Sequence, residues 1–129
     1  MLCIIPFCEH DRDQAIANIE WIKKLGGWGK HRLLTITKVE LAIDGIENIG
    51  DYERIDVKWD GRDASGVNSL FRQAAYWVYM NDRQPWLWNE PDAIWLRGGV
   101  LDRLEADYVA HGKPFMGPVR VAGKGRKHL

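Results

Sequence analysis

The chain has 129 residues, of which 46% are hydrophobic, and its 18 basic residues balance 18 acidic ones. This length suits one compact domain spanning residues 1–129, and the apolar content, with seven tryptophans, excludes a disordered chain. The balanced charge gives no general reason to expect nucleic acid or an anionic membrane as a partner. Any site for an anion therefore has to be built locally.

The sequence predicts neither a membrane span nor a secretory signal. No stretch approaches the roughly 20 apolar residues of a span, and no basic region precedes the first apolar run. Cys3 and Cys8 would lie roughly 16 Å apart along an extended strand, whereas a disulfide needs Cα atoms within about 7 Å of each other. We therefore expect a cytoplasmic protein with two buried, reduced thiols.

The first half of the chain predicts one helix among several short strands. Residues 1–7, "MLCIIPF", form a continuous apolar run that ends near Pro6, as a strand buried on both faces does. Between residues 14 and 25 the apolar side chains recur at helical spacing, and two glycines follow. Strand candidates then lie at 31–36 and 38–43, which can be one bent strand, and at 52–59 after the turn-rich segment 44–51.

The second half predicts two more helices and further buried strands. Apolar residues recur at helical spacing over 69–80, where Asn68 is a candidate cap, and over 98–112. The apolar run 85–88, "PWLW", predicts a buried strand. The remaining expected segments are a continuation of that strand at 92–96, a last core strand at 114–117 and a basic tail at 118–129.

This alternation of strands and helices predicts an α/β fold, a three-layer αβα sandwich with a mostly parallel, Rossmann-like sheet. Ligands in such folds bind at the carboxyl ends of the strands. Two loops are expected at those ends: "PFCEHD" follows the first strand, and "NEPDA" follows the strand at 86–88.

The second of these loops carries the most unusual polar pair in the chain. Glu90 and Asp92 stand between apolar runs, and two residues that are two apart on an extended segment point to the same side. Pro91 stiffens the backbone between them. Two carboxylates held close together repel unless they share a cation, and Mg²⁺ or Mn²⁺ would bring a phosphate with it. The simpler interpretation is a solvated turn in which Asp92 is a cap.

The surroundings of this pair resemble the metal-binding signature of glycosyltransferases with the GT-A fold. In that family an acidic pair of D-x-D type, or a variant with Glu first, directly follows an apolar strand. The segment "AIWLRGGVLDRLEADYVAHGKPFMG" after the pair resembles the family as well, as do the first strand "CIIPFCEHD" and the helix "GVNSLFRQAAYW". The likeness covers most of residues 1–117 through short motifs.

The resemblance implies a transferase that binds a nucleotide-sugar and moves the sugar to an acceptor. It implies a divalent cation, Mn²⁺ or Mg²⁺, that holds the diphosphate and stabilises charge on the leaving group. Asp92 would be the direct metal ligand, and Glu90 would contact the metal, the sugar or a bound water. The other residues that the resemblance places at the nucleotide pocket are Pro6, Phe7, Glu9 and Asn68.

The basic tail has two interpretations. It is a frayed, solvated end, or its cations contact the diphosphate and His128 supplies the late histidine ligand that the resemblance implies. GT-A domains continue beyond the "KPFMG" segment, so the chain looks like a truncated relative, and no catalytic base is assignable. The alternative function is therefore a catalytically incomplete binding module that forms a homodimer through an exposed sheet edge.

Overall fold

The computed structural model describes residues 1–50 and 65–113, with residues 65–68 described only as helical backbone. Its elements, in chain order, are β1 (Leu2–Pro6), α1 (Arg12–Lys24), β2 (Arg32–Ile36), the 3-10 helix η1 (Val39–Leu41), β3 (Glu47–Asn48), α2 (Ser65–Asn81), β4 (Trp86–Trp88) and α3 (Val100–His111).

The described strands form one parallel sheet in the order β3-β2-β1-β4. β1 pairs with β2 from Leu2 opposite Arg32 to Pro6 opposite Ile36, and on its other side it pairs with β4. All five residues of β1 are buried, which is why its sequence is a continuous apolar run rather than an alternating one. The predicted α/β fold with a parallel sheet is confirmed.

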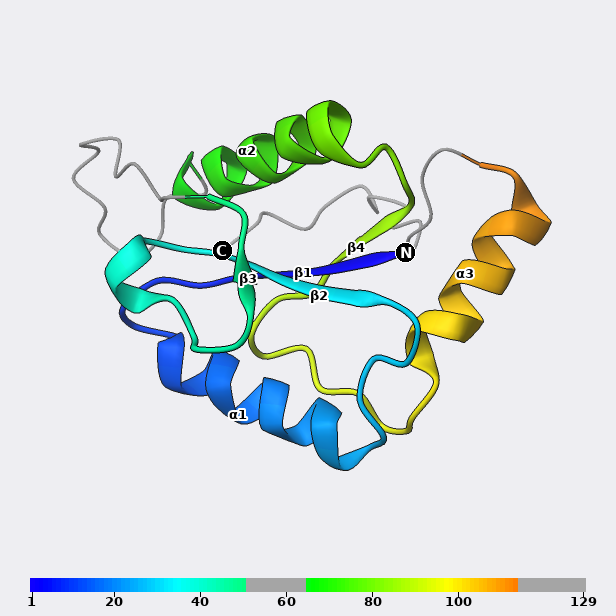
Figure 1. Ribbon diagram of the computed structural model, residues 1–129, viewed down its shortest axis with the longest axis horizontal. Helices are drawn as coiled ribbons and strands as arrows, with labels where there is room; N and C mark the ends of the chain where they lie inside the picture. Colours follow the sequence, from blue (N-terminus) through cyan, green and yellow to red (C-terminus); the bar gives the residue numbers. More distant parts are fainter. Residues whose placement is uncertain (51–64, 114–129) are drawn as a thin grey trace, which may run out of the picture.

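The two faces of the sheet are covered by different helices (Figure 1). One face packs Cys3, Ile5 and Phe7 against the apolar stripe of α1. The other face packs Leu2 and Ile4, together with β2 residues, against α2. The helix α3 stands at the end of the sheet where the strands begin (Figure 1).

Two strand predictions are wrong, and one strand was missed. Residues 38–43 contain η1 instead of a strand, because Val39 is 65% exposed and its apolar side chain is not part of a buried face. Residues 92–96 form an irregular connection, because α1 supplies the hydrogen bonds that a neighbouring strand would have supplied. The missed strand is β3, whose two polar residues pair with β2.

Other predictions lie outside the described residues: the strand at 52–59, the strand at 114–117 and the tail at 118–129. Within the described part, no helix is long and apolar enough to cross a membrane. Both cysteines are free, as expected, but only Cys3 is buried, whereas Cys8 is partly exposed.

Candidate functional site

The carboxyl ends of β1 and β4 lie side by side, because these two strands are parallel neighbours. The order of the strands also reverses here. The chain first adds β2 and β3 on one side of β1, with α1 on one face, and then returns through α2 on the opposite face to add β4 on the other side. In open α/β sheets this switch point is where the loops diverge and leave a crevice for a ligand.

The residues predicted after β1 are placed unevenly with respect to solvent. Pro6 is the buried last residue of β1, and the ring of Phe7 is 1% exposed within the core on the α1 side. Glu9 is exposed, and its Oε1 accepts a hydrogen bond from Lys38 Nζ at 3.1 Å. From this loop, therefore, Glu9 presents its side chain at the surface, whereas the Phe7 side chain stabilises the core.

Glu90 and Asp92 are both exposed at the edge where β4 ends. Neither carboxylate makes a hydrogen bond or ion pair with another residue in the described part of the chain. The Asn89 N–H donates to Ile4 O at 2.9 Å and extends the ladder by one residue, and the Ala93 N–H donates to Glu90 O at 2.9 Å and closes a turn around Pro91. The segment from Glu90 to Ala93 is therefore a turn, not the extended stretch from which the sequence placed both carboxylates on one side. The turn fixes the backbone, and no described residue pairs with the two acidic side chains.

The acidic loop, residues 89–95, is held mainly by α1. Asn18 Nδ2 donates to Pro91 O at 3.1 Å and to Ala93 O at 3.2 Å, and Trp21 Nε1 donates to Trp95 O at 2.8 Å. Within the loop, Trp95 Nε1 donates to Asn89 Oδ1 at 3.0 Å. These are ordinary hydrogen-bond lengths, and they anchor the loop on both sides of Asp92.

Sequence reasoning missed Asn18, although a signal was present. Asn18 is 5% exposed and lies on the buried stripe of α1 with Ala15, Ile19 and Ile22. A polar residue at such a stripe position has to find a hydrogen-bond partner. Its partner, a loop more than 70 residues later in the chain, is not visible from local periodicity.

Basic groups also lie at this edge of the sheet. Lys38 follows β2 and pairs with Glu9 at 3.1 Å and with Glu40 at 3.9 Å. Arg12 begins α1 directly after the loop from β1, and its Nε donates to Leu41 O at 3.0 Å. The first turn of α1 adds the partial positive charge of its N–H groups. Among the described residues, this edge therefore combines two carboxylates that have no partner with two cationic side chains.

Two predicted residues are not brought to this edge by any described contact. Asn68 lies within the first turn of α2, which begins at Ser65, so the prediction that it caps this helix is wrong, and only the helical backbone is described there. His128 lies outside the described residues. A search of the described residues finds no group of three or more His, Cys, Asp or Glu side chains that could hold a metal by themselves. Within the described part of the chain, Glu90 and Asp92 are therefore the only two of the predicted metal ligands that this edge presents.

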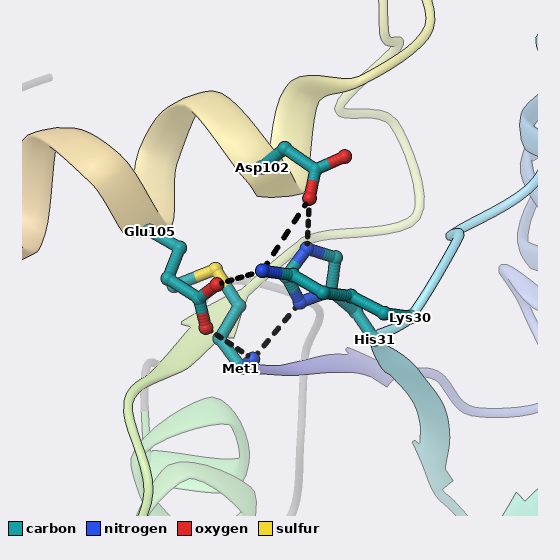
Figure 2. A network of polar contacts seen from close by, with 5 residues as sticks. All are labelled: Met1, Lys30, His31, Asp102 and Glu105. Carbon is teal, nitrogen blue, oxygen red and sulfur yellow. Dashed lines mark hydrogen bonds and ion pairs between the residues drawn. The ribbon is translucent and has the colours of Figure 1, made fainter.

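A separate polar network ties α3 to the opposite edge of the sheet (Figure 2). The α-amino group of Met1 donates to His31 Nδ1 at 2.9 Å and to Glu105 Oε1 at 2.9 Å. Since an ammonium can only donate, His31 carries its proton on Nε2 and donates it to Asp102 Oδ1 at 3.0 Å. The ion pair with Lys30, followed by the α-amino group, lowers the pKa of Glu105 to about 2.

A pocket beside this network is lined by Trp28, His31, Trp95 and Asp102 together with glycines of the turn after α1. The polar side chains in its wall are already bonded to each other, because the ring of His31 is used at both nitrogens. This edge is therefore a structural junction between the sheet and α3, and the switch point is the better candidate site.

Comparison of the chain with protein-family models, with curated proteins and with solved structures finds no match.

Proposed function

We propose that this protein is a metal-dependent glycosyltransferase of GT-A type, which binds a nucleotide-sugar at the switch point between β1 and β4. The observation that carries the proposal is the state of Glu90 and Asp92. Both carboxylates are exposed, no described residue neutralises them, and a fixed backbone holds them at the carboxyl end of β4. This is the edge where sheets of this class bind their ligands.

The chemistry of a divalent cation suits this arrangement. Mg²⁺ in nucleotide sites is typically held by one or two carboxylates, and phosphate oxygens and water complete its octahedron. A third protein ligand is therefore not required, in keeping with the described residues. Asp92 and Glu90 would hold the cation, which would neutralise charge that develops on the departing nucleoside diphosphate.

Two cationic side chains and a helix N-terminus at this edge suit an anionic ligand. Lys38 and Arg12 approach it from the ends of β2 and the loop after β1, and the N-terminus of α1 favours phosphate. Glu9, paired with Lys38, stands on the same loop and is a candidate for contacts to the nucleoside. The sugar, the acceptor and the catalytic base are not assigned by these residues.

The proposal is tested by calorimetric titration of the protein with UDP and with GDP, each with and without Mn²⁺. We expect binding that depends on Mn²⁺ and that weakens by about tenfold or more in Asp92→Asn and Glu90→Gln, a loss typical of disturbed metal sites. The matched control is Glu20→Gln, which removes an exposed carboxylate of α1 and should leave nucleotide binding unchanged. Absence of metal-dependent nucleotide binding, or binding unchanged in Asp92→Asn, would refute the proposal.

A second candidate function is an assembly module. In the described part of the sheet, β4 pairs with β1 on one side only and forms an end of the strand order, and such an edge favours pairing with another chain. Light scattering, which gives the oligomeric state, distinguishes the two functions when it is combined with the nucleotide titration. A dimer without any nucleotide affinity favours the assembly module, whereas metal-dependent binding by a monomer favours the transferase.

A further inference from the structure

We infer that Asn18 is a positioning residue for the acidic loop, which holds Asp92 in the orientation needed to share a cation with a nucleoside diphosphate. This inference rests on the proposed function, because it assigns a role at the same site. It also makes a claim of its own: the loop is organised from α1, by a side chain that does not touch the ligand.

The geometry of the contact singles out Asn18. Its one amide nitrogen donates to Pro91 O at 3.1 Å and to Ala93 O at 3.2 Å. These are the carbonyl groups of the residues immediately before and after Asp92, so a single side chain holds the peptide unit that enters Asp92 and the peptide unit that follows Ala93. The ring of Pro91 also fixes the φ angle of Pro91 itself, directly before Asp92.

Burial makes these two bonds strong determinants of loop structure. Asn18 is 5% exposed, and its Oδ1 is buried without a partner among the described residues. Turning the amide over would place that oxygen against two carbonyl oxygens and remove both bonds, so the observed orientation is strongly favoured. Pro91 is itself buried, as is its bond with Asn18, so removal of the donor leaves a buried acceptor unsatisfied, which is costly.

The consequence for binding is preorganisation. A loop that is already ordered loses little conformational entropy when a ligand binds, and affinity rises accordingly. If the donor on Asn18 is removed, Asp92 and Glu90 keep their charges but the backbone between them gains freedom. We therefore expect weaker binding of the metal and nucleotide without any loss of the ligating groups.

The test compares Asn18→Ala and Asn18→Asp with Asn48→Ala as the matched control. Asn48 also donates from one amide to two carbonyls at this edge of the sheet, Thr37 O at 3.3 Å and Gly50 O at 2.9 Å, but it does not contact the acidic loop. Its removal reports what the loss of such an amide does to stability alone. All proteins are studied well below their melting temperatures, with Mn²⁺ and UDP or GDP as the probes.

Two measurements decide the outcome. Calorimetry should show metal-dependent nucleotide affinity reduced about 10- to 100-fold in both Asn18 variants, as for other residues that orient metal ligands, and changed less than about twofold in Asn48→Ala. NMR relaxation should show the order parameter of the Asp92 amide falling from a rigid value of about 0.85 to below about 0.6 in both Asn18 variants and not in Asn48→Ala. The second measurement requires no ligand.

The two measurements separate failure of this inference from failure of the proposed function. If the wild-type protein binds no nucleotide with Mn²⁺, the proposed function fails, and the role of Asn18 in binding fails with it even where relaxation shows that it orders the loop. If the wild-type protein binds but Asn18→Ala behaves like Asn48→Ala in affinity, or leaves the Asp92 amide rigid, the inference is wrong and the proposed function stands.

Discussion

Replacing Gly98 by alanine should destabilise the protein, because the added methyl group would push the segment before α3 away from the end of α1. A Cβ atom at position 98 would overlap the backbone oxygen of Leu25, with the carbonyl carbon of Leu25 at 3.6 Å. Leu25 is the C-cap of α1, directly after its last residue Lys24, so its carbonyl is part of the backbone and cannot rotate away as the tip of a side chain would. The backbone of Gly98 is not in the left-handed range, and the effect is therefore steric.

The size of the effect follows from two contributions. Overpacking of a well-packed contact typically costs about 1–3 kcal/mol. Moving the connection outward also lengthens the bond between Trp21 Nε1 and Trp95 O, now 2.8 Å, and such a bond contributes about 0.5–1.5 kcal/mol. We expect the free energy of unfolding to fall by about 2–3 kcal/mol, because relief of the overlap sacrifices part of the bond.

Urea denaturation at 25 °C, followed by tryptophan fluorescence, measures this change with the wild-type m-value as a check on two-state behaviour. Gly45→Ala is the reference: Gly45 has a φ of +77° and open space around its Cα, so that variant reports only the cost of a left-handed alanine, about 1–2 kcal/mol. A loss below about 0.5 kcal/mol for Gly98→Ala, the range of ordinary surface substitutions, would refute the steric reasoning.

Three further results are expected. Trp95→Phe should lower the free energy of unfolding in urea by about 1–3 kcal/mol, because a buried acceptor loses its donor; an unchanged value would contradict this. Folding lowers the pKa of Glu105 from 4.5 to about 2, chiefly through Lys30, so its stabilisation is complete above pH 4.5 and is lost as the pH falls toward 2. In Glu105→Gln, the urea midpoint should accordingly depend less steeply on pH between 4.5 and about 2 than it does in the wild-type protein. An equally steep dependence would argue against the ion pair. Burial raises the pKa of Cys3 to about 12, so iodoacetamide at pH 8 should label the partly exposed Cys8 first, as counted by mass spectrometry; equal rates would contradict the burial of Cys3.

The sequence predicted those elements whose own residues show a clear pattern of burial. β1 is buried on both faces, and its continuous apolar run predicted this burial. The helix α1 is stabilised by an apolar stripe at helical spacing, and β4 by a short run of large apolar residues. In each case the residues that determine the structure lie within the element itself, so local pattern was sufficient.

Elements stabilised by distant partners were not predictable in this way. The polar pair Glu47–Asn48 becomes β3 because its backbone pairs with Leu34 and Thr35. Residues 92–96 form an apolar run after Asp92, as a buried strand does, yet the carbonyl groups of Ala93 and Trp95 accept hydrogen bonds from Asn18 and Trp21.

At the candidate site, too, the sequence predicted the residues but not the contacts between distant segments. Glu90 and Asp92 were found from the sequence, because two acids after an apolar run are conspicuous in a local window. Their placement beside the loop from β1 depends on β4 pairing with β1, and their support depends on Asn18. Both are tertiary features, and only the structure supplies them.

The contacts between α1 and the acidic loop also define which parts of the protein open together. Contacts proceed along both segments in the same direction: Asn18 meets Pro91 and Ala93, Trp21 meets Trp95, and the end of α1 meets Gly98. Cooperative units in native proteins follow such contacts rather than chain order. In hydrogen exchange, the amides of the loop should therefore lose protection together with α1, and a ligand held by the two carboxylates would slow exchange in a helix more than 70 residues earlier in the chain.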